Sequence, residues 1–165
     1  MTAPTSRPAQ SAGHRSVTPH LVVRGAAQAL DFYRRAFDAV ERGRCELPNG
    51  TLGHAELMVG DSLITLADEF PDLGYLSPLA RGGSTVVLRL DVEDVDAAFA
   101  RALAAGATLL RPVQDQFYGD RAGTLVDPFG HVWTIATHVE DLTHDEIMRR
   151  AETATKAAAE KDKST

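Results

Sequence analysis

The sequence has a single cysteine, no long apolar run and no excess of positive charge, and each shortage excludes a class of protein. Cys45 on its own excludes an internal disulfide and a cysteine-rich zinc site. No apolar stretch approaches the roughly 18 residues that a membrane-spanning helix needs, so no membrane partner is expected. Lys and Arg number 17 against 23 Asp and Glu, a net charge of −6 without a basic stripe. We therefore expect no nucleic-acid partner.

What is present is ordinary for one soluble domain: 165 residues, of which 44% are apolar and 24% charged. Residues 1–16 are polar and rich in Pro, Ser and Ala, which predicts a disordered arm. They lack the apolar core of a signal peptide, so a cytoplasmic location is expected. Residues 17–141 are assigned to the folded domain. Residues 142–165 are assigned to a C-terminal helix and a flexible tail: Thr143 and Glu146 form a capping-box pattern that begins a helix through about Ala151.

The segment 53–66 is the most informative stretch, because it predicts a β-hairpin with ionisable side chains on one face. Gly60 and Asp61 form a two-residue turn of the Gly-X type between two alternating runs. Such a turn would pair Glu56 with Thr65. Directly opposed residues share a face, so this face carries four side chains: His54, Glu56, Met58 and Thr65.

The order of predicted elements occurs twice, which indicates a duplicated unit. A helix at 26–37 corresponds to one at 95–105, and a strand at 62–67 to one at 131–137, an offset of about 68 or 69 residues. The units span about 17–69 and 84–141. We expect an α+β fold of two tandem βαβββ units that form one curved mixed sheet, a half-open barrel with helices on the convex face. The concave side would then be a cup for a ligand.

Several short motifs resemble the vicinal oxygen chelate superfamily, the group of glyoxalases, bleomycin resistance proteins and dioxygenases. They are Leu30-Asp31-Phe32-Tyr33 in the first helix and Asp127-Pro128-Phe129-Gly130 before the last strand. Three further segments resemble its PhnB-like branch: Gly53-His54-Ala55-Glu56-Leu57, Gln116-Phe117-Tyr118-Gly119-Asp120-Arg121 and Ala136-Thr137-His138-Val139-Glu140-Asp141. The resemblance covers about 17–141. It is specific for the fold and weak for the reaction, because the superfamily hosts many activities.

The resemblance also implies where a metal would bind. Metal enzymes of this superfamily take their ligands from the first and last strands of each unit. Counting from the motifs places these positions at Thr18, Thr65, Val87 and Thr134. None of the four is a usual divalent-metal ligand, so we expect no metal and no other cofactor. An error in the counting would be an even number of residues, since an odd slip turns the strand over.

The same parity places four strongly polar residues in the cup: His20, His54, Glu56 and Arg89. The segment that contains Gln116, Phe117, Tyr118 and Arg121 is expected to close its rim, and Thr18, Thr65 and Thr134 are expected to contact the ligand. Trp133 alternates away from the cup and should pack under the helices. His131 and His138 are expected to be solvated or to cap the chain. Asp127 is expected to serve only the turn that it begins.

Three hypotheses fit these residues. In the first, Glu56 is the base of a metal-independent lyase or isomerase, His20 or His54 relays the proton, and Arg89 or Arg121 holds an anionic group. In the second, His20, His54 and Glu56 bind a displaced metal ion as a dioxygenase or lyase would. In the third, the protein only binds a drug or metabolite.

Charged and hydroxyl groups outnumber aromatic ones in the expected cup, which favours an enzyme for a small polar or natural-product-like molecule. A structural alternative also stays open: Glu56 and Arg89 would form an ion pair, with His20 and His54 solvated at the rim. A homodimer through sheet edges or the C-terminal helix is expected.

Overall fold

A computed structural model describes the backbone of residues 16–162 and the side chains of residues 16–156. The first unit consists of β1 (His20–Val23), α1 (Ala26–Phe37), β2 (Val40–Glu46), β3 (Leu52–Val59) and β4 (Ser62–Asp68). The second consists of β5 (Val87–Asp91), α3 (Val95–Ala105), β6 (Thr108–Asp115), β7 (Asp120–Val126) and β8 (Val132–His138). The link between them contains η1 (Pro71–Leu73) and α2 (Pro78–Arg81), and α4 (His144–Asp162) follows the second unit.

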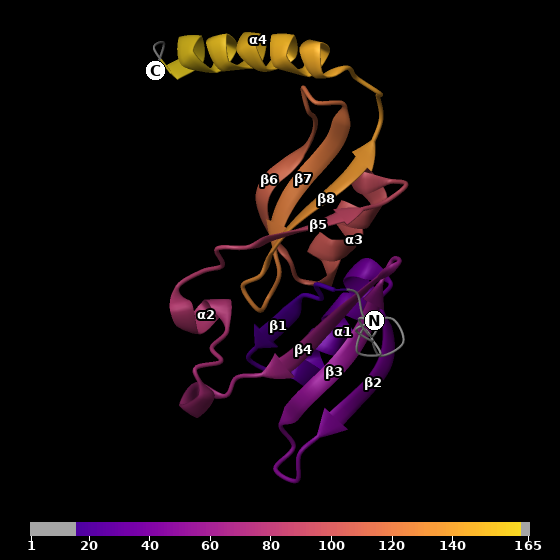
Figure 1. Cartoon of the computed structure of the whole chain (residues 1–165), viewed down its shortest axis with the longest axis vertical. Coiled ribbons are helices and arrows are strands. Elements are labelled where there is room, and N and C mark those ends of the chain that lie inside the picture. Colours follow the sequence, from indigo (N-terminus) through magenta and orange to yellow (C-terminus); the bar gives the residue numbers. More distant parts are fainter. Residues whose placement is uncertain (1–15, 163–165) are drawn as a thin grey trace, which may run out of the picture.

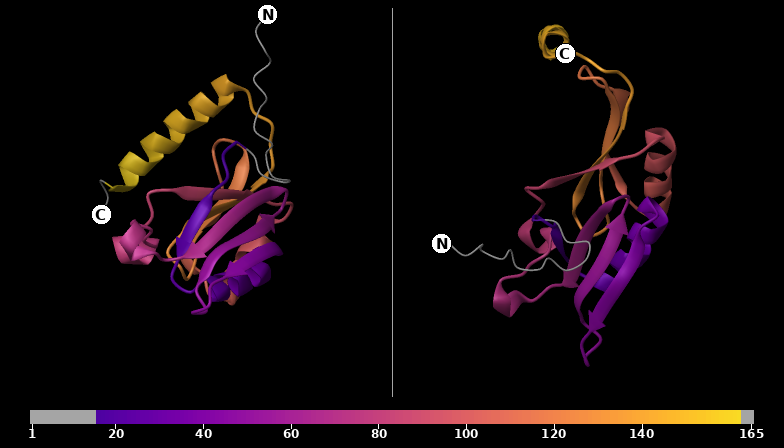
Figure 2. Two further views of the ribbon diagram at one scale, coloured as in Figure 1. Left: turned by 60° about the horizontal axis from the view of Figure 1, so that its bottom comes forward. Right: turned by 45° about the vertical axis from the view of Figure 1, so that its right-hand side comes forward.

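The two units share one topology, which confirms the duplication. Their strand orders are β1-β4-β3-β2 and β5-β8-β7-β6, with the first and last strand of each unit parallel. Within the described chain the strands form two four-stranded sheets, so the expected single curved sheet is divided in two. The units instead pack through α1 and α3, which lie on the same side of the two sheets (Figures 1 and 2).

The predicted hairpin is confirmed residue by residue. Val59 pairs with Ser62 and Glu56 pairs with Thr65, while Gly60 takes the positive φ that the turn requires. Apolar side chains of the alternate positions, such as Leu57 and Leu66, are buried beneath α1. The side chains of the intervening positions therefore lie on the opposite face of the sheet, which no helix of the described residues covers.

Aromatic side chains from both units meet in the core. The cluster consists of Phe32, Tyr33 and Phe37 of α1 with Phe129 and Trp133 of the second unit. The ring centroids of Phe37 and Trp133 lie 4.7 Å apart, and Trp133 is buried under the helices as predicted. These contacts join the two units into one hydrophobic core.

A buried carboxylate, Asp127, lies among these rings. Its Oδ2 accepts hydrogen bonds from the Tyr33 hydroxyl (2.7 Å) and the Trp133 indole nitrogen (2.9 Å). Its Oδ1 accepts from the backbone N–H groups of Phe129 and His131, both at 2.9 Å. Asp127 was expected only to stabilise the turn, but it also accepts hydrogen bonds from two side chains of the core, Tyr33 and Trp133.

The sequence underestimated the regular structure near the C-terminus. The last helix was expected to end at about Ala151, but α4 continues to Asp162. The added residues are mainly Ala, Lys and Glu, which have high helix propensity, and Arg150 anchors the first turns to Glu140 and Glu146. The predicted arm at 1–16 lies, except for Ser16, outside the described residues, as does the end of the tail. Within residues 16–162, no helix combines the length and the apolar composition needed to cross a membrane.

Candidate functional site

Four polar side chains lie together on the face of the first sheet opposite α1, and we call them the histidine–glutamate row: His20, Thr65, Glu56 and His54. The register places Thr65 of β4 between His20 of β1 and Glu56 of β3. His20 Nδ1 lies 2.8 Å from Thr65 Oγ1, and His54 Nε2 lies 3.5 Å from Glu56 Oε1. The two imidazole rings stack with centroids 6.3 Å apart. The predicted shared face is thus confirmed for these residues.

The surroundings of His20 favour its neutral form. Partial burial, and secondarily the nearby His54, lower the pKa of His20 below its ordinary value. The Thr65 hydroxyl donates to the backbone carbonyl of Pro19 (3.3 Å), so its oxygen is left to accept from His20 Nδ1. In this arrangement Nε2 of His20 is the basic nitrogen at neutral pH.

The residues at the superfamily's metal positions do not fit a metal ion. The strand register places His20 opposite Thr65 and Arg89 opposite Thr134, two residues after the expected positions Thr18 and Val87. One histidine, two threonines and a cationic arginine make a poor donor set. Among the described residues, no group of three His, Cys, Asp or Glu side chains is placed to hold an ion, including His20, His54 and Glu56.

Arg89 is held in the second unit and does not pair with Glu56. Its guanidinium contacts Asp91 and Asp120, each with a closest distance of 2.6 Å. Asp120 also lies 2.9 Å from His138, which contacts Asp141 at the same distance. Hydrogen bonds to these two carboxylates raise the pKa of His138, which was expected to be merely solvated or capping. Arg89 is therefore already neutralised and is not poised for an anionic ligand.

Two other expected positions have structural partners. Thr134 Oγ1 lies 3.2 Å from Thr124 Oγ1 across the β7–β8 pair. His131 is half-buried, and its Nε2 lies 3.2 Å from the carbonyl oxygen of Val22, so it links the second unit to β1.

The expected rim segment lies elsewhere. Gln116, Phe117 and Tyr118 occupy the β6–β7 turn, and the first two line a hollow of about 640 Å³ beside α4. Arg121 forms ion pairs with Asp96 of α3 and with Asp115, so it turns toward the helix side of the sheet and cannot hold a ligand in the cup. The expectation that these residues close the cup was wrong because the β6–β7 turn extends toward α4.

Two aromatic residues that sequence reasoning missed, Phe70 and Tyr75, border the site. They lie in the link after β4 and pair through their backbones, with N–H to oxygen contacts of 2.9 and 3.1 Å. They close a cavity of about 360 Å³ that we call the β1 pocket. Its lining consists of His20, Val22, Leu47, Gly53, Ala67, Asp68, Phe70, Leu73 and Tyr75. These two rings add to Phe117 and Tyr118, the aromatic residues that the sequence placed at the rim.

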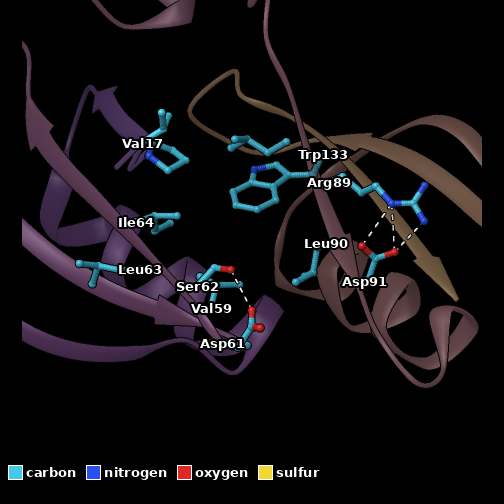
Figure 3. Close-up of a pocket in the computed structure, with 13 residues that line it drawn as sticks. Val17, Val59, Asp61, Ser62, Leu63, Ile64, Arg89, Leu90, Asp91 and Trp133 are labelled. Carbon is cyan, nitrogen blue, oxygen red and sulfur yellow. Dashed lines mark hydrogen bonds and ion pairs between the residues drawn. The ribbon is translucent and has the colours of Figure 1, made fainter. Parts of the chain in front are cut away.

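A larger cavity of about 510 Å³ lies between the two units (Figure 3). The turn at Asp61 and the residues Leu63 and Ile64 line one side, and Arg89 and Trp133 line the other. None of its lining residues belongs to the histidine–glutamate row, although Leu63 and Ile64 directly precede Thr65 in β4. The smaller β1 pocket, by contrast, shares His20 with the row.

Comparisons with known proteins agree with this fold. A family model described as the glyoxalase/bleomycin resistance protein/dioxygenase superfamily matches residues 14–135. An uncharacterized protein of Mycobacterium tuberculosis is 46% identical over 135 residues, which cover 80% of this chain and 79% of the relative. A solved gene product of Arabidopsis thaliana is 29% identical with a TM-score of 0.61, covering 74% of this chain and 98% of that one. A Bacillus cereus structure described as a PhnB protein has 20% identity and a TM-score of 0.59, with coverages of 74% and 99%.

Proposed function

Because the chain belongs to the glyoxalase/bleomycin resistance protein/dioxygenase superfamily, we propose that it is an enzyme that transfers protons within a small molecule at the histidine–glutamate row. The observation that carries the proposal is the state of His20. It is held by Thr65, kept neutral by its surroundings and stacked on His54, which itself contacts Glu56. The donor set at the superfamily's metal positions supports chemistry that does not use that metal.

The row supplies the two groups that an isomerisation of a hydroxyketone requires. Glu56 would take the proton from the carbon beside the carbonyl, which leaves an enediolate. His20 Nε2 would accept the hydroxyl proton and return it to the former carbonyl oxygen. The carbon proton then returns from Glu56 to the neighbouring carbon, so no proton is gained or lost overall. His54, 3.5 Å from Glu56, stabilises the carboxyl group through both steps.

An isomerisation assay tests the role of His20. Hydroxyacetone in D₂O should lose its C–H signals and form lactaldehyde faster with the protein than in buffer alone, as measured by proton NMR. A His20→Gln variant should form lactaldehyde about 10- to 100-fold more slowly, because a neutral amide cannot accept the hydroxyl proton, while Glu56 can still exchange the carbon proton. The wild-type rate of isomerisation should fall only at pH values below 6.5, since the pKa of His20 is lowered and the neutral form is the active one. An unchanged rate of isomerisation in His20→Gln would contradict the assignment.

A second candidate function, binding without turnover, is favoured by the aromatic rings of Phe70 and Tyr75. Ligand-sequestering proteins hold planar molecules by stacking and edge-to-face contacts with such rings. In that case, substitution of Glu56 would change only the affinity for a ligand, and the protein would catalyse no exchange of hydroxyacetone above the buffer rate.

The proposed assembly is a cytoplasmic homodimer that forms through the edge of the second sheet. β5 and the residue before it expose Val87 (57%) and Val86 (61%), an apolar surface on an unpaired strand edge. β1 lies at the equivalent edge of the first sheet. In a dimer with two-fold symmetry, β5 of each copy can therefore lie beside β1 of the other copy, which gives two identical contacts.

A charge on this edge should separate the copies. Val87→Lys should weaken the dimer about 100-fold or more, because the ammonium would have to be buried without a partner. Light scattering coupled to size-exclusion chromatography measures the mass. Val40→Lys, which places the same charge on the exposed strand β2, is the matched control and should leave the dimer intact. Equal masses for wild type and Val87→Lys would exclude this edge as the interface.

A further inference from the structure

We propose that the β1 pocket binds an uncharged planar ring of the substrate and that Tyr75 and Phe70 select for this ring. The inference rests on the proposed function, because the polar end of the same molecule is the part on which Glu56 and His20 act. It goes beyond that function by dividing the substrate into a polar reacting end and a flat apolar end.

The position of His20 connects the two parts. Its imidazole belongs to the histidine–glutamate row and also lines the β1 pocket. The Tyr75 ring meets it edge-to-face, with centroids 6.4 Å apart and an interplanar angle of 82°. Two rings at a right angle form a corner in which a third ring can stack on one and meet the edge of the other.

The size and lining of the pocket define the ligand further. A volume of about 360 Å³ lies at the lower end of ligand pockets, which span roughly 300–1,000 Å³. The remaining walls are the aliphatic side chains of Val22, Leu47, Ala67 and Leu73. A one- or two-ring group fits this space, whereas a long or highly polar chain would leave the aliphatic walls without contacts.

The charge of the lining argues against an anionic ring. Among the lining residues that the structure describes, Asp68 is the one acidic residue, and none is Lys or Arg. Its side-chain oxygens accept hydrogen bonds from the backbone N–H groups of Gly25 (3.0 Å), Ala26 (2.8 Å) and Leu52 (2.8 Å), which fix the carboxyl group in place. A carboxylate on the ring would face this acidic side chain, and like charges repel one another.

The segment that carries the selecting rings is anchored at both ends. Glu69 accepts hydrogen bonds from the backbone N–H (2.9 Å) and hydroxyl (2.6 Å) of Ser77 and from Arg24 (3.0 Å). The bonds from Ser77, with a smaller effect of Arg24, lower the pKa of Glu69 to about 2. Between the anchors, Tyr75 is 52% and Leu73 71% exposed, which is apolar surface that a bound ring would cover.

Calorimetric titration with 2-naphthol and 2-naphthoate tests the proposal. Wild type should bind 2-naphthol at least tenfold more tightly than 2-naphthoate. Tyr75→Ala should weaken 2-naphthol binding about tenfold, whereas Tyr75→Phe should keep it, because the ring and not the hydroxyl makes the contact. Leu79→Ala, at an equally exposed position of α2 outside the pocket, is the control and should bind like wild type. Tyr75 is half-exposed, so thermal unfolding should show that both Tyr75 variants fold normally.

The outcomes separate this inference from the proposed function. Absence of 2-naphthol binding below millimolar concentration, equal affinity in Tyr75→Ala, or tighter binding of 2-naphthoate would overturn the ring site. Glu56→Gln should bind 2-naphthol within about threefold of wild type, since Glu56 is not a lining residue. If Tyr75 controls binding while Glu56→Gln still exchanges hydroxyacetone normally, the ring site stands and the proposed function fails. If exchange requires Glu56 but binding ignores Tyr75, only the ring site fails.

Discussion

Replacing Asp127 by alanine should lower the free energy of unfolding by about 4 kcal/mol, a large share of the roughly 5–15 kcal/mol that stabilises a domain. The substitution leaves the Tyr33 hydroxyl and the Trp133 indole N–H buried without an acceptor, and each such loss costs about 1–3 kcal/mol. Burial, and then the charge of Asp127, raise the pKa of Tyr33 well above its ordinary value, so Tyr33 remains a donor. Two backbone N–H groups also lose their acceptor.

Urea unfolding followed by tryptophan fluorescence measures this effect, because Trp133 is the only tryptophan and lies at the altered site. Tyr33→Phe should cost only about 1–2 kcal/mol, since the carboxylate keeps its other donors. Asp31→Ala, which removes an exposed carboxylate of α1 paired with Arg34, is the matched control and should change stability by less than about 0.5 kcal/mol. Equal midpoints for Asp127→Ala and Asp31→Ala would show that the buried bonds do not hold the two units together.

The second large effect concerns catalysis. Glu56→Gln should slow the deuterium exchange of hydroxyacetone by roughly 1,000-fold, within the range of about 10²–10⁴ that a positioned base contributes. The amide has nearly the same shape as the carboxylate but cannot accept the carbon proton. The loss should appear in kcat and in kcat/KM alike, because the proton is transferred only in the transition state.

A control variant with the same substitution at an exposed position isolates the role of the Glu56 carboxylate. Glu93→Gln removes one negative charge from the exposed loop between β5 and α3 and should leave the exchange rate unchanged. Circular dichroism of both variants should match wild type, since Glu56 lies on the sheet face opposite α1 and outside the hydrophobic core. A Glu56→Gln protein that exchanges hydroxyacetone at the wild-type rate would remove the base from the proposed mechanism.

The first sheet was predictable because its information is local. The Gly60 turn and the alternation on both sides fix which residues oppose one another, so the placement of Glu56 beside Thr65 required no tertiary knowledge. The first strand was harder, because the motif in α1 does not show where β1 begins. The residue paired with Thr65 is His20, two positions after the expected Thr18, and an even difference of this kind keeps the same face of the sheet.

The link between the units could not be predicted in the same way. The hydrogen bonds from Ser77 to Glu69 hold the segment that places Phe70 and Tyr75 at the pocket. Such a contact cannot be predicted from the periodicity of the sequence. The partners of Arg89 were missed for a related reason. Asp120 lies 31 residues away in sequence and meets Arg89 through β8, so the competing Glu56 pair was equally plausible from the sequence.

The double role of Asp68 limits how this protein can diversify. The same carboxylate forms part of the pocket wall, caps the first turn of α1 and ties down the start of β3. A substitution of Asp68 that reshapes the pocket would therefore also lower the free energy of unfolding. Leu73 and Tyr75, by contrast, are largely exposed and lie outside the hydrophobic core. Relatives that acquire new ligands should therefore differ at the pocket residues within 70–75 and retain Asp68. Selection for a new ligand and selection for stability would then act on different residues.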